Sequence, residues 1–351
     1  MGRLLIILAF NSATRKFEGI PSICYWQGGL FATWYAGVTP GEDQNNYVVL
    51  ASSDDHGLSW RDIIVVDPDG NGPVRAYDPQ IWADPDGRLW FFWAQQVSAS
   101  TPAKSPAELW EMHTMGGSSS NPQWSAPSKI ANGVMMGKPI VLSTGEWCLP
   151  VSVWMQPQDS AQCVVSTDHG QTWQVRGACD VPVDVRTYDE HRILEKQDGS
   201  LLMWVRTRYG IGESMSYDKG YTWSRLVPAA IKHTNSRFFL GRLSSGRLIL
   251  VKNGQLTEDC GRANLTAYVS TDDGRTWPYG LLLDERKQVS YPDVTQSPDG
   301  TIFIIYDFDR TGARDILLAR LTELDIMRGE MVAAQSRLRM KVNGSNGSLN
   351  E

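Results

Sequence analysis

Side chains that transfer protons, bind anions or act as nucleophiles recur at the beginnings and ends of expected strands in this chain. Gathering so many charged and aromatic groups at one end of a fold costs desolvation energy unless they serve a purpose. We therefore predict that they line a ligand site; the alternative is that they neutralise one another in ion pairs. The groups are Glu18, Asp78, Lys138, Glu190, Arg237, Tyr291 and Asp293 at strand beginnings, Arg206 at a strand end, and Arg262 before a third strand.

A repeated turn predicts the elements that position these groups. Its pattern is Ser-x-Asp-x-Gly-x-x-Trp or a close variant. In each copy the Asp can accept hydrogen bonds from N–H groups two residues on. The Gly supplies a positive φ, and the Trp packs between sheets. The four copies are SSDDHGLSW (52–60), STDHGQTW (166–173), SYDKGYTW (216–223) and STDDGRTW (270–277).

The spacing of the copies predicts six units. Asp168, Asp218 and Asp272 follow one another at intervals of about 50 residues, and Asp55 precedes Asp168 by about two intervals. A degenerate turn is expected at 115–124, and hairpins flank each Gly or Asp-Gly turn. Units of this length with several short strands predict an all-β, six-bladed β-propeller.

One propeller domain is expected over residues 1–340, and the polar tail 341–351 is expected to be disordered. Residues 4–10 (LLIILAF) are interpreted as a strand that completes the last blade. No small-x-small cleavage site follows them, which favours a cytoplasmic over a secreted location.

Composition argues against several partners. The formal net charge is −6 with the charges interspersed, so nucleic acid is an unexpected partner. No segment is long enough to cross a membrane. The five cysteines and five histidines lack metal-ligand spacing, and we expect no metal and no cofactor.

The turns and the six-fold count resemble the sialidase superfamily, with its Asp-box turns and six-bladed propeller, over about residues 17–326. Asp189-Glu190 followed by DGSLLMWVRTRYG resembles the segment with that family's glutamate and second arginine, which implies Glu190 and Arg206. RANL (262–265) resembles the third-arginine segment, which implies Arg262. VSYPD (289–293), with DGTIFIIYDFDR beyond, resembles the tyrosine segment, which implies Tyr291.

The resemblance implies a retaining exo-glycosidase that removes a terminal acidic sugar, such as sialic acid, from a glycan or glycoconjugate. A phenol has a pKa of about 10 and is a poor nucleophile at neutral pH. A carboxylate at Glu190 can take the proton of Tyr291 as it attacks. Arg206 and Arg262 would hold the anionic group of the sugar.

The chain departs from the family in its first segment. Sialidases read Phe-Arg-Ile-Pro there, whereas this chain reads FEGIP (17–21), so the first arginine is absent and Glu18 stands near its place. Arg237, Arg75 or Arg186 are candidates to replace it. Asp78 and Glu18 are further candidate substrate ligands. The acid is expected from the loop 37–46, with Asp43 the nearest candidate and Glu42 its rival.

Two other functions remain open at this point. A polysaccharide lyase or uronic-acid-directed enzyme on the same scaffold would use Tyr291 or a histidine to abstract a proton. A glycan-binding propeller would carry no catalysis. His191 beside Glu190 is a weak candidate base, because alternation along a strand should point it away from Glu190.

Overall fold

The computed structural model describes residues 5–6, 12–70, 72–97, 106–154, 156 and 158–343. The chain forms two compact units. Unit 1 comprises residues 1–129, 291–322 and 335–351, and unit 2 comprises residues 130–290 and 323–334.

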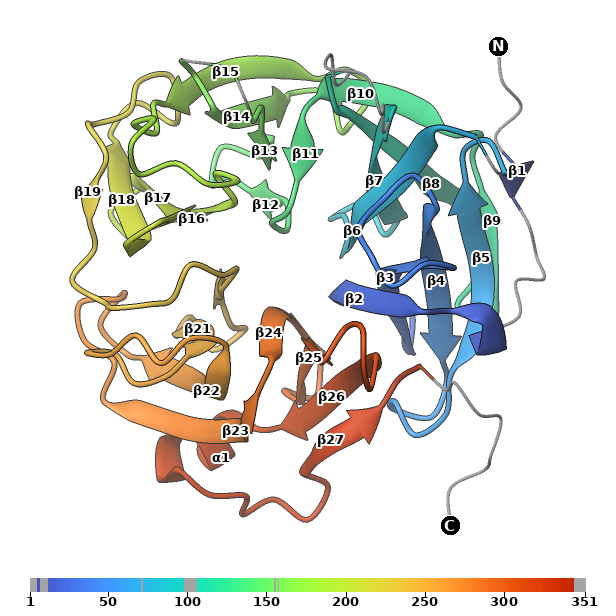
Figure 1. Ribbon diagram of the computed structural model, residues 1–351. Helices are drawn as coiled ribbons and strands as arrows, with labels where there is room; N and C mark the ends of the chain where they lie inside the picture. The colour runs from blue at the N-terminus through green and yellow to red at the C-terminus, as the bar shows by residue number, and fades with distance from the viewer. Residues whose placement is uncertain are drawn as a thin grey trace. The chain divides into compact units, whose positions relative to one another are not determined.

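Unit 1 contains the first, second and last sheets of the chain apart from residues 130–132 and 289–290 (Figure 1). A 3-10 helix, η1 (Ser12–Thr14), precedes β2. The first sheet has the order β1 (Leu5–Ile6), β5 (Arg61–Asp67), β4 (Asn46–Ser53), β3 (Gly29–Gly37) and β2 (Phe17–Trp26). The second contains β6 (Val74–Ala83), β7 (Leu89–Val97), β8 (Glu108–Ser118), β9 (Asn121–Trp124) and β10 (Ser128–Asn132). The last contains β24 (Val289–Gln296), β25 (Ile302–Phe308), β26 (Asp315–Leu321) and β27 (Arg337–Lys341).

Unit 2 contains the third, fourth and fifth sheets and the short helix α1 (Glu323–Arg328). The third sheet contains β11 (Val134–Met135), β12 (Ile140–Val141), β13 (Trp147–Ser152), β14 (Ala161–Ser166) and β15 (Gln174–Cys179). The fourth contains β16 (His191–Glu195), β17 (Leu201–Thr207), β18 (Gly210–Ser216) and β19 (Val227–Pro228). The fifth contains β20 (Phe239–Arg242), β21 (Leu248–Asn253), β22 (Ala263–Ser270) and β23 (Tyr279–Lys287).

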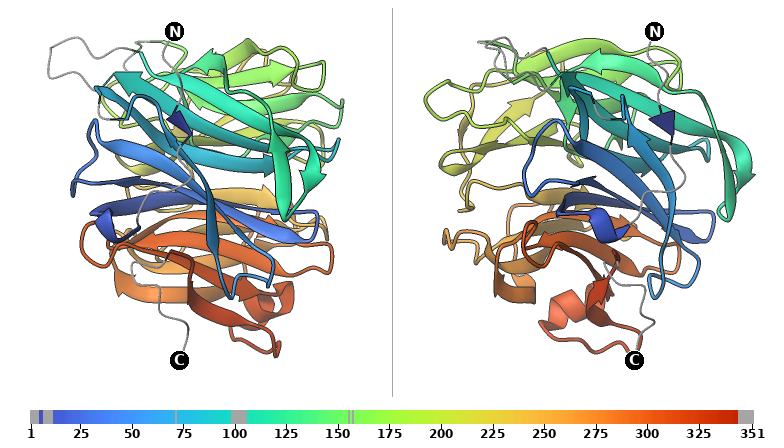
Figure 2. Two further views of the ribbon diagram at one scale, coloured as in Figure 1. Left: turned by 90° about the vertical axis from the view of Figure 1, so that its right-hand side faces the viewer. Right: turned by 45° about the vertical axis from the view of Figure 1, so that its right-hand side comes forward.

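Each sheet is antiparallel, and its central strands lie side by side in chain order, as the views of Figures 1 and 2 show. The exceptions are β1 beside β5, β10 beside β8 and β11 beside β13. Six such sheets in one chain make the six-bladed β-propeller that the repeat predicted, and the all-β class is confirmed. The hairpin expected at 115–124 is present as β8 and β9.

Two details of the predicted layout are wrong. The strand at Leu5–Ile6 pairs with β5 of the first blade, and the last blade takes its fourth strand from β27 instead. Order also continues past the expected end of the domain, because Asn343 is buried and its side chain donates to Glu18 and to the carbonyl of Arg314. The rest of the tail lies outside the described residues.

The four repeated turns share one set of hydrogen bonds. In the third copy, Ser216 Oγ accepts from Gly220 N at 2.8 Å and donates to Asp218 Oδ1 at 2.9 Å. Asp218 accepts the N–H and hydroxyl of Thr222, four residues on rather than the expected two. The same bonds recur in the other three copies, so the motif closes a seven-residue loop as a unit.

The tryptophans of these turns pack against apolar cores within each unit. In unit 1, Trp60 lies against a cluster that includes Trp34 and Phe303. In unit 2, Trp223 packs on the cluster between the third and fourth blades, and Trp277 is part of the cluster between the fourth and fifth blades. Trp277 is buried and Trp60 and Trp223 are half-buried, and these contacts give three of the turns a fixed place on their sheets.

The first strands of several blades are bent where the charged residues stand. Ile20, Asp78 and Tyr291 lie within first strands and have φ values of 61°, 47° and 55°, a region that non-glycine residues rarely occupy. The pairing of β2 with β3 and of β6 with β7 shifts register at these points. Such bulges re-aim the neighbouring side chains. Backbone in this conformation persists only when surrounding contacts hold it, and it concentrates at functional sites.

The shared hydrogen bonds of the turns generate a stability prediction. Ser216→Ala leaves the buried N–H of Gly220 without its acceptor, which should cost about 1–3 kcal/mol of unfolding free energy. Thr222→Ala removes an exposed hydroxyl from the same turn and should cost less than about 0.5 kcal/mol. Urea unfolding of both variants measures the difference. Equal losses would show that the turn is not held by its serine.

Candidate functional site

Unit 2 holds Glu190 among arginines. Glu190 precedes β16 and is only 5% exposed. Its Oε1 accepts from Arg206 Nη1 at 2.9 Å, and its Oε2 lies 3.7 Å from Nε of Arg237. Arg206 and Arg237 are themselves buried. The ion pair with Arg206, anticipated as the alternative to a catalytic Glu190, is therefore present.

The arginines keep Glu190 ionised. Burial by itself would raise the pKa of this carboxyl, but the charges of Arg206 and Arg237 and the hydrogen bond from Arg206 outweigh burial and lower it. Arg262, half-buried at the start of β22, adds to the same effect. Unit 2 thus brings Glu190, Arg206, Arg237 and Arg262 together. The cluster carries three positive charges against one negative charge, which suits an anionic ligand.

Unit 1 holds Tyr291 beneath an arginine that the sequence analysis did not single out. Tyr291 lies in β24 and is 5% exposed. The guanidinium carbon of Arg310 lies 4.1 Å from the centre of its ring. Arg310 Nε donates to Asp307 Oδ2 at 2.8 Å, and its Nη1 lies 3.4 Å from Glu42 Oε1.

The remaining predicted ligands of unit 1 surround two buried tyrosines. The guanidinium carbon of Arg75 lies 3.8 Å from the ring centre of Tyr77. Burial raises the pKa of Tyr35 and of Tyr77, and the charge of Asp78 raises both further. Glu42 acts on Tyr35 and Tyr77 in the same direction. Arg75, Asp78 and Glu42 therefore act electrostatically on the same two tyrosines.

Glu18 has a structural environment. Its Oε1 accepts from Arg15 Nη1 and Trp34 Nε1, and its Oε2 accepts from Asn343 Nδ2. Both oxygens are committed to the first and last blades. These contacts do not support the expectation that Glu18 binds substrate.

Asp43 shapes its own loop. Its Oδ1 accepts from the backbone and side chain of Asn45, and its Oδ2 accepts from the hydroxyl of Thr39. Its neighbour Glu42 is the residue of this loop that contacts Arg310. The two carboxylates of this loop therefore differ in their contacts. Asp43 is held within the loop, whereas Glu42 contacts Arg310.

Two further residues considered from the sequence are structural. Arg186 donates to the carbonyl oxygens of Val181 and Gln156 and pairs with Asp189, so it does not replace the missing arginine. His191 is buried, and its ring nitrogens contact the carbonyl oxygens of Gln162 and Asp189. Burial lowers the pKa of His191 to about 4. Its side chain is separate from the ion pairs of Glu190, as strand alternation predicted.

Sequence reasoning missed Arg310, Tyr188 and Asn235. Asn235 Oδ1 accepts from Arg206 Nε at 2.7 Å, and the guanidinium carbon of Arg206 lies 5.0 Å from the ring centre of Tyr188. Arg310 had one sequence signal, which is its place in DFDR directly after the second strand of the last blade. Nothing in its own segment indicated that it turns back over Tyr291.

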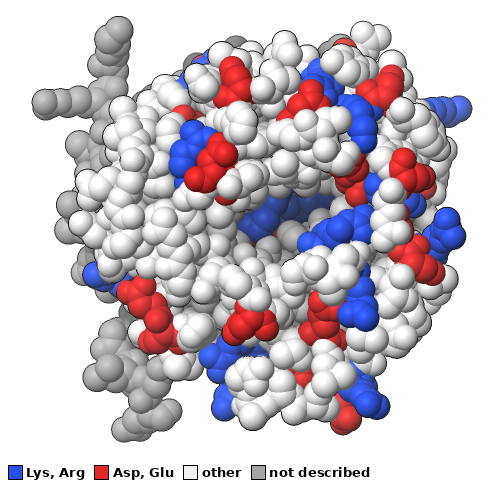
Figure 3. Space-filling view, turned by 180° about the vertical axis from the view of Figure 1, so that it is seen from behind, with Lys and Arg blue, Asp and Glu red and all other residues white. Residues whose placement is uncertain are grey.

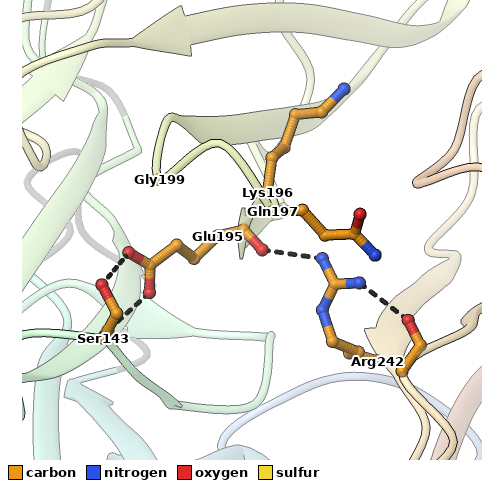
Figure 4. Close-up of a pocket in the computed structure, with 7 residues that line it drawn as sticks. Ser143, Glu195, Lys196, Gln197, Gly199 and Arg242 are labelled. Atoms are coloured by element: carbon orange, nitrogen blue, oxygen red, sulfur yellow. Dashed lines mark hydrogen bonds between the residues drawn. The ribbon is translucent and has the colours of Figure 1, made fainter.

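A pocket of about 290 Å³ lies elsewhere in unit 2 (Figure 4). Its polar groups are engaged with one another, because Glu195 accepts from the N–H and hydroxyl of Ser143 while Arg242 donates to the carbonyls of Glu195 and Gly246. Glu195 ends β16, whereas Glu190 precedes it. At about 3.3 Å per residue, the pocket is at the opposite end of that strand.

Other kinds of site find no support among the residues that the structure describes. Within those ranges, no group of three or more His, Cys, Asp and Glu side chains is placed to hold a metal ion. No helix in the same ranges has the length and apolar character needed to span a membrane. Acidic and basic side chains are interspersed over the outer part of the face drawn in Figure 3.

Comparison with known proteins identifies the family of this chain and proteins that are similar to it. A profile for the BNR repeat-like domain matches residues 28–304. A sialidase from Micromonospora viridifaciens is 28% identical over 160 residues, which are 42% of this chain and 23% of that protein. The match therefore spans about a quarter of the length of this curated relative.

Two solved structures share the fold. The Hadza microbial sialidase Hz136 superimposes with a TM-score of 0.70 at 20% identity, over 88% of this chain and 66% of its own. A leech intramolecular trans-sialidase, solved with 2,7-anhydro-Neu5Ac, gives a TM-score of 0.72 at 15% identity, over 92% of this chain and 70% of its own. At these identities the likeness shows a sialidase-like propeller.

The burial of His191 generates a pH prediction. An unfolded histidine titrates near pH 6.5, whereas His191 in the fold has a pKa of about 4. The unfolded chain therefore binds a proton first, and stability falls as the pH drops from about 6.5 towards 4. Between pH 7 and 4.5, wild type should lose about 2–3 kcal/mol more than His191→Gln in urea unfolding. An identical pH dependence of both proteins would show that His191 titrates normally in the fold.

Proposed function

Because this chain belongs to the BNR repeat-like domain family, we propose that it is a sialidase-like exo-glycoside hydrolase that removes a terminal acidic sugar from a glycan. The observation that carries the proposal is the buried Glu190 carboxylate held between Arg206 and Arg237, with Arg262 acting on it. Such a cluster offers a proton acceptor beside cations that can bind an anionic sugar.

The first step transfers the sugar to Tyr291. The phenolic oxygen bonds to the anomeric carbon, the bond from that carbon to the glycosidic oxygen breaks, and Glu190 takes the phenolic proton. Asp43 donates a proton to the departing oxygen. Arg206 and Arg262 bind the sugar's anionic group and fix the orientation of the ring.

The second step returns the enzyme to its starting state. Water attacks the anomeric carbon from the side that the leaving group vacated, and Asp43 takes the proton of that water. The bond between the carbon and Tyr291 breaks as Glu190 returns the proton to the phenol. Two displacements at one carbon give retention of configuration.

The environments of Tyr291 and Glu190 support these roles. A neutral phenol avoids the repulsion that a carboxylate nucleophile would meet at an anionic sugar, which is the physical reason for a tyrosine here. Glu190 is ionised and so is ready to accept a proton. The left-handed backbone of Tyr291, with φ of 55°, is of the kind found where a fold holds a reactive side chain in place.

The lyase alternative lacks a histidine base in this region. His191 has both ring nitrogens in contact with backbone carbonyl oxygens, which leaves neither directed at a substrate. We therefore favour hydrolysis.

Replacement of the nucleophile and the base tests the proposal. Tyr291→Phe should lower kcat/KM for a fluorogenic α-sialoside at least about a thousandfold, and Glu190→Gln should lower it about 10²–10⁴-fold. Because the two residues act in one step, the double variant should be no worse than the poorer single variant. Incubation with 2,3-difluorosialic acid followed by peptide mass mapping should place a covalent sugar on Tyr291.

The result that contradicts the proposal is wild-type turnover in both single variants. Chromatography of the products distinguishes hydrolysis from intramolecular transfer, since only hydrolysis yields the free reducing sugar. Circular dichroism of each variant checks that lost activity is not lost folding.

The residue that acts as the acid is identified by comparing how its replacement slows the cleavage of substrates with different leaving groups. Asp43→Asn should slow cleavage of an alkyl sialoside about 10²-fold or more, and should affect an activated aryl sialoside much less, because an aryl oxide leaves without a proton. Glu42→Gln is the matched neighbour and should show no such selectivity. Selectivity in Glu42→Gln, with none in Asp43→Asn, would reassign the acid to Glu42.

A further inference from the structure

The space that an arginine of the first segment would fill is occupied in this protein by another residue. When Ile20 and Pro21 are matched to the Ile-Pro of the sialidase segment, Gly19 takes the arginine's position. Gly19 has no side chain, and the neighbouring Glu18 is committed to Arg15, Trp34 and Asn343. The first blade therefore contributes no cation at this point.

Arg310 covers Gly19. A Cβ atom built on Gly19 would lie 2.7 Å from Cδ and 2.9 Å from Cγ of Arg310, closer than side-chain atoms normally approach. The aliphatic part of Arg310 thus runs through the volume that any side chain at residue 19 would need. A glycine at residue 19 and an arginine at residue 310 are mutually dependent features of unit 1.

Buried contacts hold Arg310 in this path. Asp307 is fully buried, and its Oδ2 accepts both from Arg310 Nε at 2.8 Å and from the backbone N–H of Ile20 at 2.9 Å. The guanidinium lies over the ring of Tyr291. One carboxylate therefore fixes the left-handed turn at Ile20 and the direction of Arg310 together.

The outer contact of Arg310 is weaker. Glu42 lies 3.4 Å from Nη1, and its side chain is 45% exposed. Exposed ion pairs of this kind contribute little and are screened by salt. A carboxylate of a bound sugar can take the place of Glu42 without disturbing Asp307.

Arg310 carries its charge at every pH of interest. Burial alone would lower its pKa, but Asp307, Tyr291 and Tyr35 raise that pKa above its ordinary value. This permanent cation lies directly over the proposed nucleophile. If it has a role beyond structure, that role is to bind an anionic group of the substrate.

We infer that Arg310 replaces the arginine missing from the first segment and binds the anionic group of the substrate, with Glu42 as its counter-ion in the free protein. The inference rests on the proposed function and adds a specificity-determining residue to it. The cation comes from the loop after the second strand of the last blade instead of from the first strand of the first blade.

The test compares an unsaturated sialic acid analogue with its methyl ester, using the full chain and isothermal titration calorimetry. The acid carries the negative charge and the ester does not, so the ratio of their dissociation constants measures recognition of the anion. Arg310→Met keeps the aliphatic volume over Gly19 and should reduce this ratio about 10- to 100-fold. Arg320→Ala, which removes a guanidinium bound to the carbonyl of Gln335, is the matched control and should leave the ratio unchanged.

Gly19→Ala provides a measurement that keeps every charge. The added methyl group meets Arg310 and displaces it, so the preference for the acid should fall although no ion pair has been deleted. The double variant Gly19→Arg with Arg310→Gly moves the cation back to the first strand and should restore part of the preference. If Arg310→Met leaves Asp307 buried without its partner and so unfolds the protein, Gly19→Ala and the double variant test the role of Arg310 instead.

The outcomes separate the two proposals. Wild type that binds the acid more tightly than the ester, with a ratio unchanged in Arg310→Met and Gly19→Ala, would overturn the role of Arg310 and leave the proposed function standing. Wild type that neither distinguishes the two ligands nor cleaves a sialoside would overturn both.

Discussion

Buried carboxylates decide where the arginines of this protein point. A carboxylate removed from water must be paired or hydrogen-bonded, because the cost of leaving it bare is several kcal/mol. Asp307 in unit 1 satisfies this requirement with the N–H of Ile20 and the guanidinium of Arg310. Glu190 in unit 2 satisfies it with Arg206 and Arg237. In both cases the buried anion fixes the direction of the cations around it.

The two units use this arrangement for different purposes. Around Glu190 the charges of Arg206, Arg237 and Arg262 lower the pKa of the carboxyl and keep it ionised. Around Arg310 the acids Asp307 and Glu42 balance the cation, and one of the two pairs is exposed and exchangeable. Both arrangements are built from the same pair of side-chain types, a carboxylate and a guanidinium.

The backbone of the first strands bends at the positions of the candidate residues. Ile20, Asp78 and Tyr291 all adopt left-handed conformations at the points where the candidate residues stand. Asp293 fixes the neighbouring strand by accepting from the hydroxyl of Ser22 and the N–H of Ile23. Short-range repeats in the sequence carry no sign of these bulges, since neither Ile nor Tyr is a residue that prefers a positive φ. They are held by contacts with residues far away in the chain.

The sequence by itself determined the blades, because the turn that closes each one is local: serine, aspartate and glycine within five residues supply its hydrogen bonds. It also determined the types of residue that begin each first strand. Only the tertiary structure decided that β1 joins the first blade and that Glu18 is tied to Arg15, Trp34 and Asn343. It alone showed that Arg310 occupies the space over Gly19, because that contact joins residues 291 positions apart and depends on a buried aspartate. Hydrogen bonds between residues close together in the chain can be predicted from a sequence. The pairing of buried charges that lie far apart in the chain is decided only by the tertiary structure.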